Sequence, residues 1–236
     1  MPMQERLRER ERVGDATLDP RSVRTRQALR WALAQELAAT GDLSQVTVTS
    51  LARRAGLTRR TFYTHYRDIP DFVSQVEEEA LSELAERIKA IGKADLAELV
   101  AVLTDYAPAP GAVELLGYIK ENGGFYSGLL GEGGDPAFAE KVKRLAHDII
   151  APRALTGLDA SAAGFFDYYI TYAVSAEVGV LVRWLDGGMR ESCEAMARIM
   201  TVLCFVRPGD LYGLPISLDV PAYSEALMRF EEDSDD

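Results

Sequence analysis

Apolar residues recur at intervals of three and four along most of the chain, which is the spacing of one face of an α-helix. The first such segment starts at Asp19-Pro20, a typical helix beginning, and ends before Gly41, a typical helix stop. Its apolar stripe consists of Leu29, Ala32, Leu33 and Leu37. We therefore expect an amphipathic helix from about residue 20 to Thr40.

Two short helices and one long helix are predicted next. The first short helix starts after Thr47 and runs to Ala55. After a break at Gly56, Thr58 is placed to cap the second, which ends near residue 66 or 67. A long helix then follows from Ile69 to about residue 90, and the same periodicity predicts helices at about 94–106, 112–121, 136–151, 159–186, 191–206 and 221–232.

The connectors at 107–111, 122–136 and 207–221 are rich in glycine and proline. Alternating β-branched runs bounded by hairpin turns, the pattern of β-strands, are absent. The pattern predicts an all-α protein. We divide it into a flexible arm over residues 1–20, a three-helix helix-turn-helix domain over 21–67, and a helical domain over 68–236 with an acidic tail.

The composition is that of a globular protein, with 47% hydrophobic and 27% charged residues among 236. No apolar run approaches the roughly 18 residues that cross a bilayer, and the first residues lack the apolar core of a secretory signal. Cys193 and Cys204 stand eleven positions apart on a predicted helix, roughly 16 Å, too far for a disulfide. We expect a cytoplasmic protein with no membrane partner.

Charge is distributed unevenly over a chain whose net charge is −11. Residues 21–67 hold nine arginines against Glu36 and Asp42, a local net charge of +7. Residues 68–236 hold 13 basic and 30 acidic residues, a net charge of −17. This asymmetry indicates an anion-binding module on an acidic body, although a solvated basic surface without a partner would have the same charge.

The segment Val46–Tyr66 has the layout of a unit that places its second helix in the major groove of DNA. With Phe62 at the centre of the buried face, a helical wheel turns Arg60, Thr61, Tyr63 and Thr64 outward, with Arg59 and His65 at the edges. Arginine reads guanine through two hydrogen bonds, and hydroxyl groups bind phosphates. Thr47 and Thr58 stand at helix N-termini, which favour a phosphate oxygen.

The same segment resembles the TetR/AcrR family of transcriptional regulators over about residues 24–72. The matching positions are Thr47-Val48, Leu51-Ala52, Ala55-Gly56-Leu57-Thr58, Thr61-Phe62-Tyr63 and His65-Tyr66. The resemblance implies an all-helical homodimer whose C-terminal body binds a small molecule or a partner. It also implies phosphate contacts from Tyr63 and His65, a backbone or base contact from Thr61, and base or phosphate contacts from Arg59 and Arg60.

Two positions depart from the family pattern. Arg60 stands where the family often has glycine or alanine, so we expect a different operator. Ile69 replaces a lysine that commonly touches phosphate, and Arg67 is the candidate substitute. For His65 the alternative to phosphate contact is a purely structural role. For Arg53 and Arg54 the alternative to phosphate contact is that they are solvated charges.

Aromatic residues concentrate in two parts of the C-terminal body and are candidates for a ligand pocket. They are Phe125, Tyr126, Phe165, Phe166, Tyr169 and Tyr172. An apolar, uncharged lining favours a hydrophobic or aromatic small-molecule effector, while core packing is the alternative role. The resemblance implies that the helices at 159–186 and 191–206 pair with their symmetry mates in a four-helix bundle; packing within one subunit is the alternative.

Catalytic and metal-binding patterns are absent from the sequence. His65, His147 and the two cysteines lack the spacing of metal ligands or of a nucleophile and base. We therefore expect no enzyme activity, metal or cofactor. The sequence predicts a ligand-responsive repressor that binds a palindromic operator as a dimer; the alternative is a small-molecule- or partner-binding helical module whose DNA-reading helix is degenerate.

Overall fold

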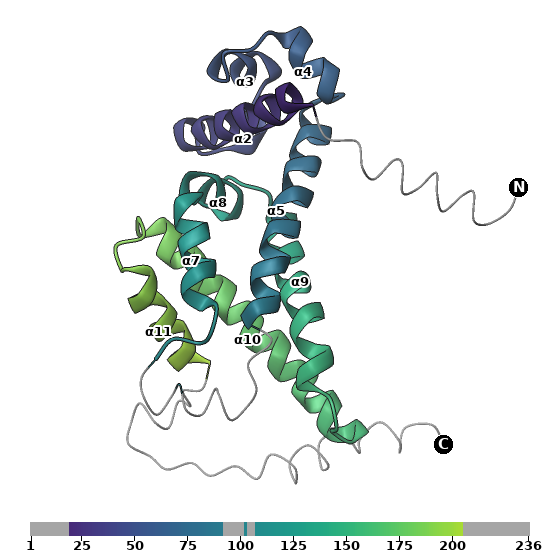
Figure 1. Cartoon of the computed structure of the whole chain (residues 1–236), viewed down its shortest axis with the longest axis vertical. Helices are drawn as coiled ribbons and strands as arrows, with labels where there is room; N and C mark the ends of the chain where they lie inside the picture. The colour runs from purple at the N-terminus through teal and green to yellow at the C-terminus, as the bar shows by residue number, and fades with distance from the viewer. Residues whose placement is uncertain (1–18, 92–101, 103–106, 205–236) are drawn as a thin grey trace, which may run out of the picture.

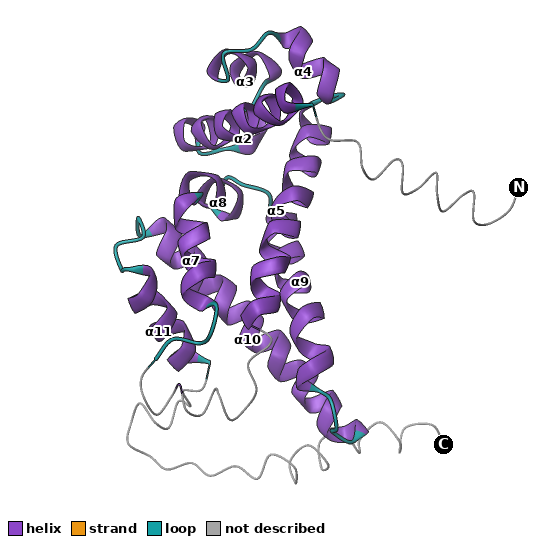
Figure 2. Cartoon of the chain, viewed as in Figure 1, coloured by secondary structure: helices purple, strands orange, loops and turns teal. Residues whose placement is uncertain are grey.

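The computed structural model of the protein describes residues 19–91, 102 and 107–204. Helices and turns make up this described part, which contains no strand (Figure 2). The predicted all-α fold is confirmed. Residues 1–18 of the expected arm over 1–20 lie outside the described residues, as do most of the helix at 94–106, the segment near 221–232 and the acidic tail. Within the described ranges, no helix is both long enough and apolar enough to cross a membrane.

The N-terminal helices, which we call the head, are α2 (Pro20–Thr40), the 3₁₀ turn η1 (Leu43–Gln45), α3 (Val48–Arg54) and α4 (Arg59–His65). Local signals set the ends of α2. The Asp19 side chain accepts a hydrogen bond from the Arg21 N–H at 3.1 Å. At the other end Gly41 adopts φ +64° and its N–H donates to the Leu37 carbonyl.

The remaining helices, which we call the body, stand below the head in Figure 1. They are α5 (Ile69–Ile91), α7 (Ala112–Glu121), α8 (Gly123–Leu130), α9 (Pro136–Ala154), α10 (Ala160–Asp186) and α11 (Cys193–Leu203). Apart from α8, each lies within a few residues of a predicted helix. Asp135, Asp159 and Ser192 cap α9, α10 and α11 by accepting a backbone N–H, which explains why these helices begin where they do.

The prediction of a connector over residues 122–136 is wrong in its first half, because helix α8 occupies Gly123–Leu130. Its glycines serve packing. A Cβ at Gly128 would lie 2.7 Å from the Cβ of Leu37, so this glycine lets α8 approach α2 closely. Phe125, Tyr126 and Leu129 on the same helix are buried. Tertiary packing therefore outweighs the weak helix propensity of the glycines.

One hydrophobic core extends from the head into the body. It includes Leu29 and Phe62 in the head, Phe72 in α5, and Phe138 and Trp184 deep in the body. Helix α2 packs on α8, α5 on α9, α9 on α10, and α7 on α11. The head therefore packs on the body through a continuous apolar contact, in addition to the short chain connection from α4 to α5.

Candidate nucleic-acid interface

The turn between α3 and α4 fixes the direction in which α4 points. Gly56 adopts φ +66°, a backbone conformation that is strained for residues with a side chain but not for glycine. The Leu57 N–H then donates to the Ala52 carbonyl at 2.8 Å, which closes the turn. Leu51 and Ala52 are buried against the rest of the head, so α3 is held in place and α4 crosses it.

Thr47 and Thr58 cap α3 and α4 as predicted. The Thr47 hydroxyl accepts the Ser50 N–H at 3.1 Å, and the Ser50 hydroxyl accepts the Thr47 N–H at 3.2 Å. The Thr58 hydroxyl accepts the Thr61 N–H at 3.1 Å and lies 2.9 Å from the Thr61 hydroxyl. Both capping residues are exposed. Phosphate contact from these two N-termini stays a prediction.

The inward face of α4 is an aromatic anchor. Phe62, Tyr66 and Phe72 are buried, and their ring centroids lie 4.8 to 5.7 Å apart. Burial raises the pKa of Tyr66, which therefore stays neutral. These contacts tie α4 to the start of α5 and leave the opposite face of α4 turned away from the protein.

The outward face of α4 carries the residues singled out by the helical wheel. Arg59, Arg60, Tyr63 and Thr64 are exposed, whereas Thr61 and His65 are half-buried. Tyr63 is 51% exposed, so its ring and hydroxyl are open to solvent. The Thr64 hydroxyl already donates to the Arg60 carbonyl at 3.0 Å, so it has only lone pairs to offer a further partner.

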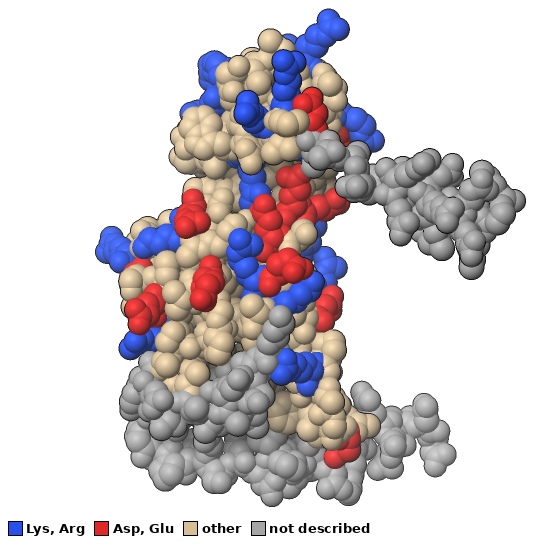
Figure 3. Space-filling model, viewed as in Figure 1, with Lys and Arg blue, Asp and Glu red and all other residues tan. Residues whose placement is uncertain are grey.

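Unpaired positive charge gathers on this face. Among the described residues, no carboxylate lies within ion-pair distance of Arg53, Arg59 or Arg60. Arg67 contacts Asp71 at 3.4 Å while most of its side chain stays exposed. Figure 3 shows basic side chains over the head and acidic side chains gathered below it. The surface therefore suits a polyanion.

Arg54 neither stays a fully solvated charge nor is left free for a phosphate, the two roles that the sequence suggested. Its guanidinium forms an ion pair with Glu36 of α2, whose carboxylate is buried, with only 4% of the residue exposed. Arg54 therefore holds α3 on α2, whereas its neighbour Arg53 is exposed. The two partners are 18 positions apart, and no local signal in the sequence links them.

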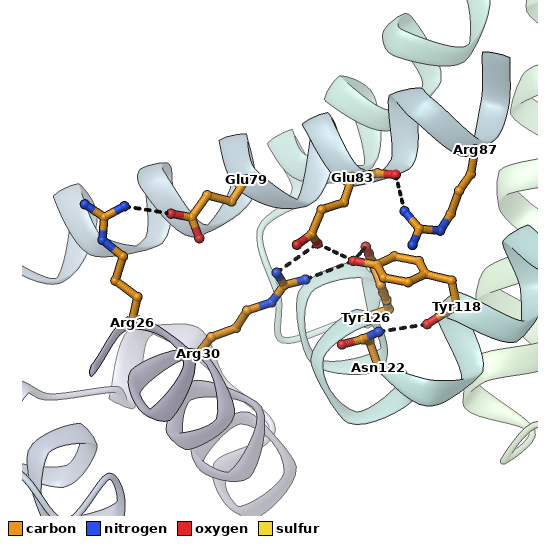
Figure 4. A network of polar contacts seen from close by, with 8 residues as sticks. All are labelled: Arg26, Arg30, Glu79, Glu83, Arg87, Tyr118, Asn122 and Tyr126. Atoms are coloured by element: carbon orange, nitrogen blue, oxygen red, sulfur yellow. Dashed lines mark hydrogen bonds and ion pairs between the residues drawn. The ribbon is translucent and has the colours of Figure 1, made fainter. Parts of the chain in front are cut away.

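A polar network between head and body was also beyond the reach of the sequence (Figure 4). Arg26 and Arg30 of α2 pair with Glu79 and Glu83 of α5 at 3.5 and 2.9 Å. The Tyr118 hydroxyl of α7 donates to Glu83 as well. Burial, followed by the contact with Glu83, raises the pKa of Tyr118, so its proton is retained.

Two further side chains complete this network. Tyr126 of α8 donates to the Tyr118 hydroxyl at 3.4 Å, and the Arg87 guanidinium lies 3.6 Å from the centroid of the Tyr118 ring. Tyr118 thereby connects α5, α7 and α8. Since α2 contacts the same carboxylate, the orientation of the head depends on groups that come from three helices of the body.

The six aromatic pocket candidates lie in two separate groups. Phe125 and Tyr126 are packed in the main core. The other four lie along α10, where Phe165 and Phe166 are half-buried and Tyr172 is 71% exposed. The Tyr169 hydroxyl donates to the Cys204 carbonyl at 2.6 Å. The structure does not gather the six around one cavity, and two clefts of about 620 and 290 Å³ are lined by other residues.

Comparison with known proteins supports a regulatory role. Residues 107–205 match the model of a transcriptional regulator C-terminal region. An uncharacterised HTH-type transcriptional regulator of Bacillus subtilis (strain 168), YxbF, is 30% identical over 78 residues. These are 33% of this chain and 20% of that relative, so the chain spans about a fifth of its length.

A solved structure shares the fold. The dihydroxyacetone kinase operon activator DhaS superimposes with a TM-score of 0.52 at 16% identity, over 76% of this chain and 93% of that protein. At this identity the likeness supports the arrangement of helices alone. The two sequence matches carry the functional comparison, and the one to the C-terminal region covers the body from α7 to α11.

Proposed function

The chain belongs to the TetR family of transcriptional regulators, and from this premise we propose that it is a cytoplasmic, ligand-responsive repressor that binds a palindromic operator as a homodimer. The observation that carries the proposal is the outward face of α4. It presents Arg59, Arg60 and Tyr63 to solvent, and no carboxylate in the described ranges is paired with either arginine. A helix of this kind fits the major groove of duplex DNA.

Each side chain of the interface has a proposed role. Arg60 reads a base edge, because it is the exposed arginine nearest the middle of the outward face. Tyr63 donates its hydroxyl to a phosphate, with His65 beside it, and Arg59 binds a base or the backbone. Thr61 and Thr64 contribute hydroxyl oxygens, while Arg67 takes the phosphate contact that Ile69 cannot make.

Helices α10 and α11 carry the proposed dimer interface. Tyr168 and Tyr172 of α10 are more than two-thirds exposed, and Ile199, Val202 and Leu203 of α11 are exposed too. Large apolar residues on two helices of one subunit favour burial against a second copy. Two heads related by a two-fold axis would read half-sites about 34 Å apart, one turn of DNA.

Selection of bound sequences from a random duplex library tests the proposal. We expect a palindromic consensus, bound with an affinity that falls steeply with salt. In Arg60→Ala the preference at one base pair in each half-site should relax by about 5- to 150-fold. In Tyr63→Phe all sites should weaken similarly, by about fivefold.

Arg190→Ala is the matched control, because Arg190 is an exposed arginine of the body outside the interface. It should leave both the consensus and the affinity unchanged. Recovery of no consensus from the library would refute operator binding. If the protein also took up a small molecule tightly, the alternative of a binding module with a degenerate DNA-reading helix would be the better description.

A further inference from the structure

A cleft of about 620 Å³ lies between the head and the body and is lined by residues of both. The segment around η1 forms its upper wall. The start of α5 and the α8–α9 loop with α9 form the lower walls. The volume lies within the range of small-molecule sites in proteins, about 300 to 1,000 Å³.

A buried carboxylate with an unused acceptor lines the cleft. Glu77 of α5 is only 1% exposed. Its Oε2 accepts a hydrogen bond from Lys141 Nζ at 2.6 Å, whereas its Oε1 has no hydrogen-bond partner among the residues that the structure describes. Burial raises the pKa of Glu77, and the nearby Asp135 raises it further, against the opposing effect of Lys141. An acceptor left unpaired in the interior is costly, so this oxygen is suited to a donor from outside the chain.

The lining of the cleft indicates what kind of donor fits. The carboxylates of Asp42, Glu77 and Asp135 line the cleft together with one basic residue, Lys141, which pairs with Glu77. Asp42 stays ionised because hydrogen bonds from Ser44 and then from Gln45 lower its pKa. The rest of the lining is mostly aliphatic: Leu43, Val46, Ile69, Pro70 and Val73. Acidic groups above an aliphatic wall favour a cation with an apolar part.

We propose that this cleft binds a small organic cation, an ammonium or amidinium group on an apolar body, whose N–H donates to Glu77 Oε1. A metal ion is a poorer fit, since no group of three or more His, Cys, Asp or Glu residues in the described ranges is arranged to hold one. The apolar part of the ligand would lie on Ile69 and Val73, next to the end of α4.

The position of the cleft connects its ligand to DNA binding. The Leu43 N–H of the head donates to the Gly133 carbonyl of the body at 2.7 Å, beside the cleft. A ligand held between these walls changes how the head sits on the body. This part of the inference rests on the proposed function. It names the effector as a cation, whereas the aromatic residues led us to expect a hydrophobic or aromatic effector.

Titration of the full chain with benzylammonium, followed by amide NMR shifts, tests the site. We expect saturable shifts around Leu43 and Val73 with a Kd of about 1 mM or tighter, typical for a ligand of this size. Benzyl alcohol, a neutral analogue of the same shape, should bind at least about tenfold more weakly. Glu77→Gln should lose binding by a similar factor, because its amide can donate to Asp135 and the vacant acceptor disappears.

Glu78→Gln is the matched control, since Glu78 is the next residue of α5 and is exposed. It removes the same charge and should bind as the parent does. Ser74→Phe, at an exposed position on the rim, should fill the cleft and block binding without disturbing the fold. Absence of saturable shifts, equal binding of benzyl alcohol, or unchanged binding in Glu77→Gln would overturn the proposal.

A second readout separates this proposal from the proposed function. Operator affinity measured with and without saturating benzylammonium should differ by at least about fivefold, the lower end of ordinary allosteric coupling. Cleft binding without a change in operator affinity would overturn the effector role and leave the site intact. A protein that binds benzylammonium but no operator would refute the proposed function instead.

Discussion

Replacing Arg54 by leucine tests whether the head depends on a buried ion pair. Arg54 reaches from α3 to Glu36 of α2, and Glu36 is 4% exposed. Leucine keeps much of the apolar contact of the arginine side chain but leaves the Glu36 carboxylate without its cation. An unpaired carboxylate in this position is far less stable than one paired or in water.

The size of the effect follows from the burial of the two partners. Removing one partner of a buried ion pair costs about 3 to 5 kcal/mol. The Arg54 side chain is 33% exposed, so water reaches part of the vacated space and the lower end applies. We expect a loss of about 3 kcal/mol in the free energy of unfolding, or about 6 to 12 °C in Tm for a chain of this length.

Thermal unfolding followed by circular dichroism at fixed protein concentration measures the loss. Arg53→Leu is the control, because Arg53 is the adjacent arginine and is exposed; it should change Tm by less than about 2 °C. The double variant Arg54→Leu/Glu36→Leu should recover stability to within about 1 kcal/mol of the parent. A single variant Arg54→Leu as stable as Arg53→Leu would refute the structural role of the pair.

Three further substitutions probe the contact between head and body. Gly133→Ala should lower the free energy of unfolding by about 3 kcal/mol in urea titration. The reason is that the added Cβ would lie 1.5 Å from the Gly41 carbonyl oxygen and force the loop away. A variant as stable as the parent would contradict this close approach. Tyr118→Phe should cost about 1 to 2 kcal/mol in the same assay, because Glu83 loses a donor; no loss would show that the bond adds nothing. Burial raises the pKa of Glu77 above its ordinary 4.5, so the folded state holds this proton more tightly and stability falls as pH rises from about 4.5 through the folded pKa. Glu77→Gln should remove that fall, and an unchanged pH profile of Tm would contradict it.

The sequence predicted the head well because its signals are local. Asp19, Thr47 and Thr58 each bond to a backbone N–H two or three residues ahead, so their role can be read within one helical turn. Gly41 and Gly56 adopt positive φ at the two stops that the sequence indicated. The wheel centred on Phe62 placed Arg60, Tyr63 and Thr64 outward, and these residues are exposed on α4. It also placed Thr61 outward and Arg59 at an edge, whereas Thr61 is half-buried and Arg59 is exposed.

The contacts between head and body could not be predicted, because they join residues that are far apart in the chain. Arg30 and Glu83 are 53 positions apart, and the sequence shows only that both are charged. Aromatic clustering likewise left a pocket and core packing as alternatives, and only the structure shows that Phe125 and Tyr126 are packed in the core. Glu77 gave no signal at all, since one glutamate in the acidic run 77–79 is buried and its neighbour is exposed.

Helix α5 links the two sides of the junction by its geometry. Glu77 and Glu79 are two residues apart, about 200° around the helix, so they face opposite sides. Glu79 and Glu83 lie one turn apart and hold the arginines of α2, while Glu77 holds Lys141 of α9. A movement of α5 toward a ligand at Glu77 therefore takes Glu83 away from Arg30. Since α4 ends directly before α5, we expect this movement to reach the outward face of α4, the proposed DNA-binding surface, without any further relay.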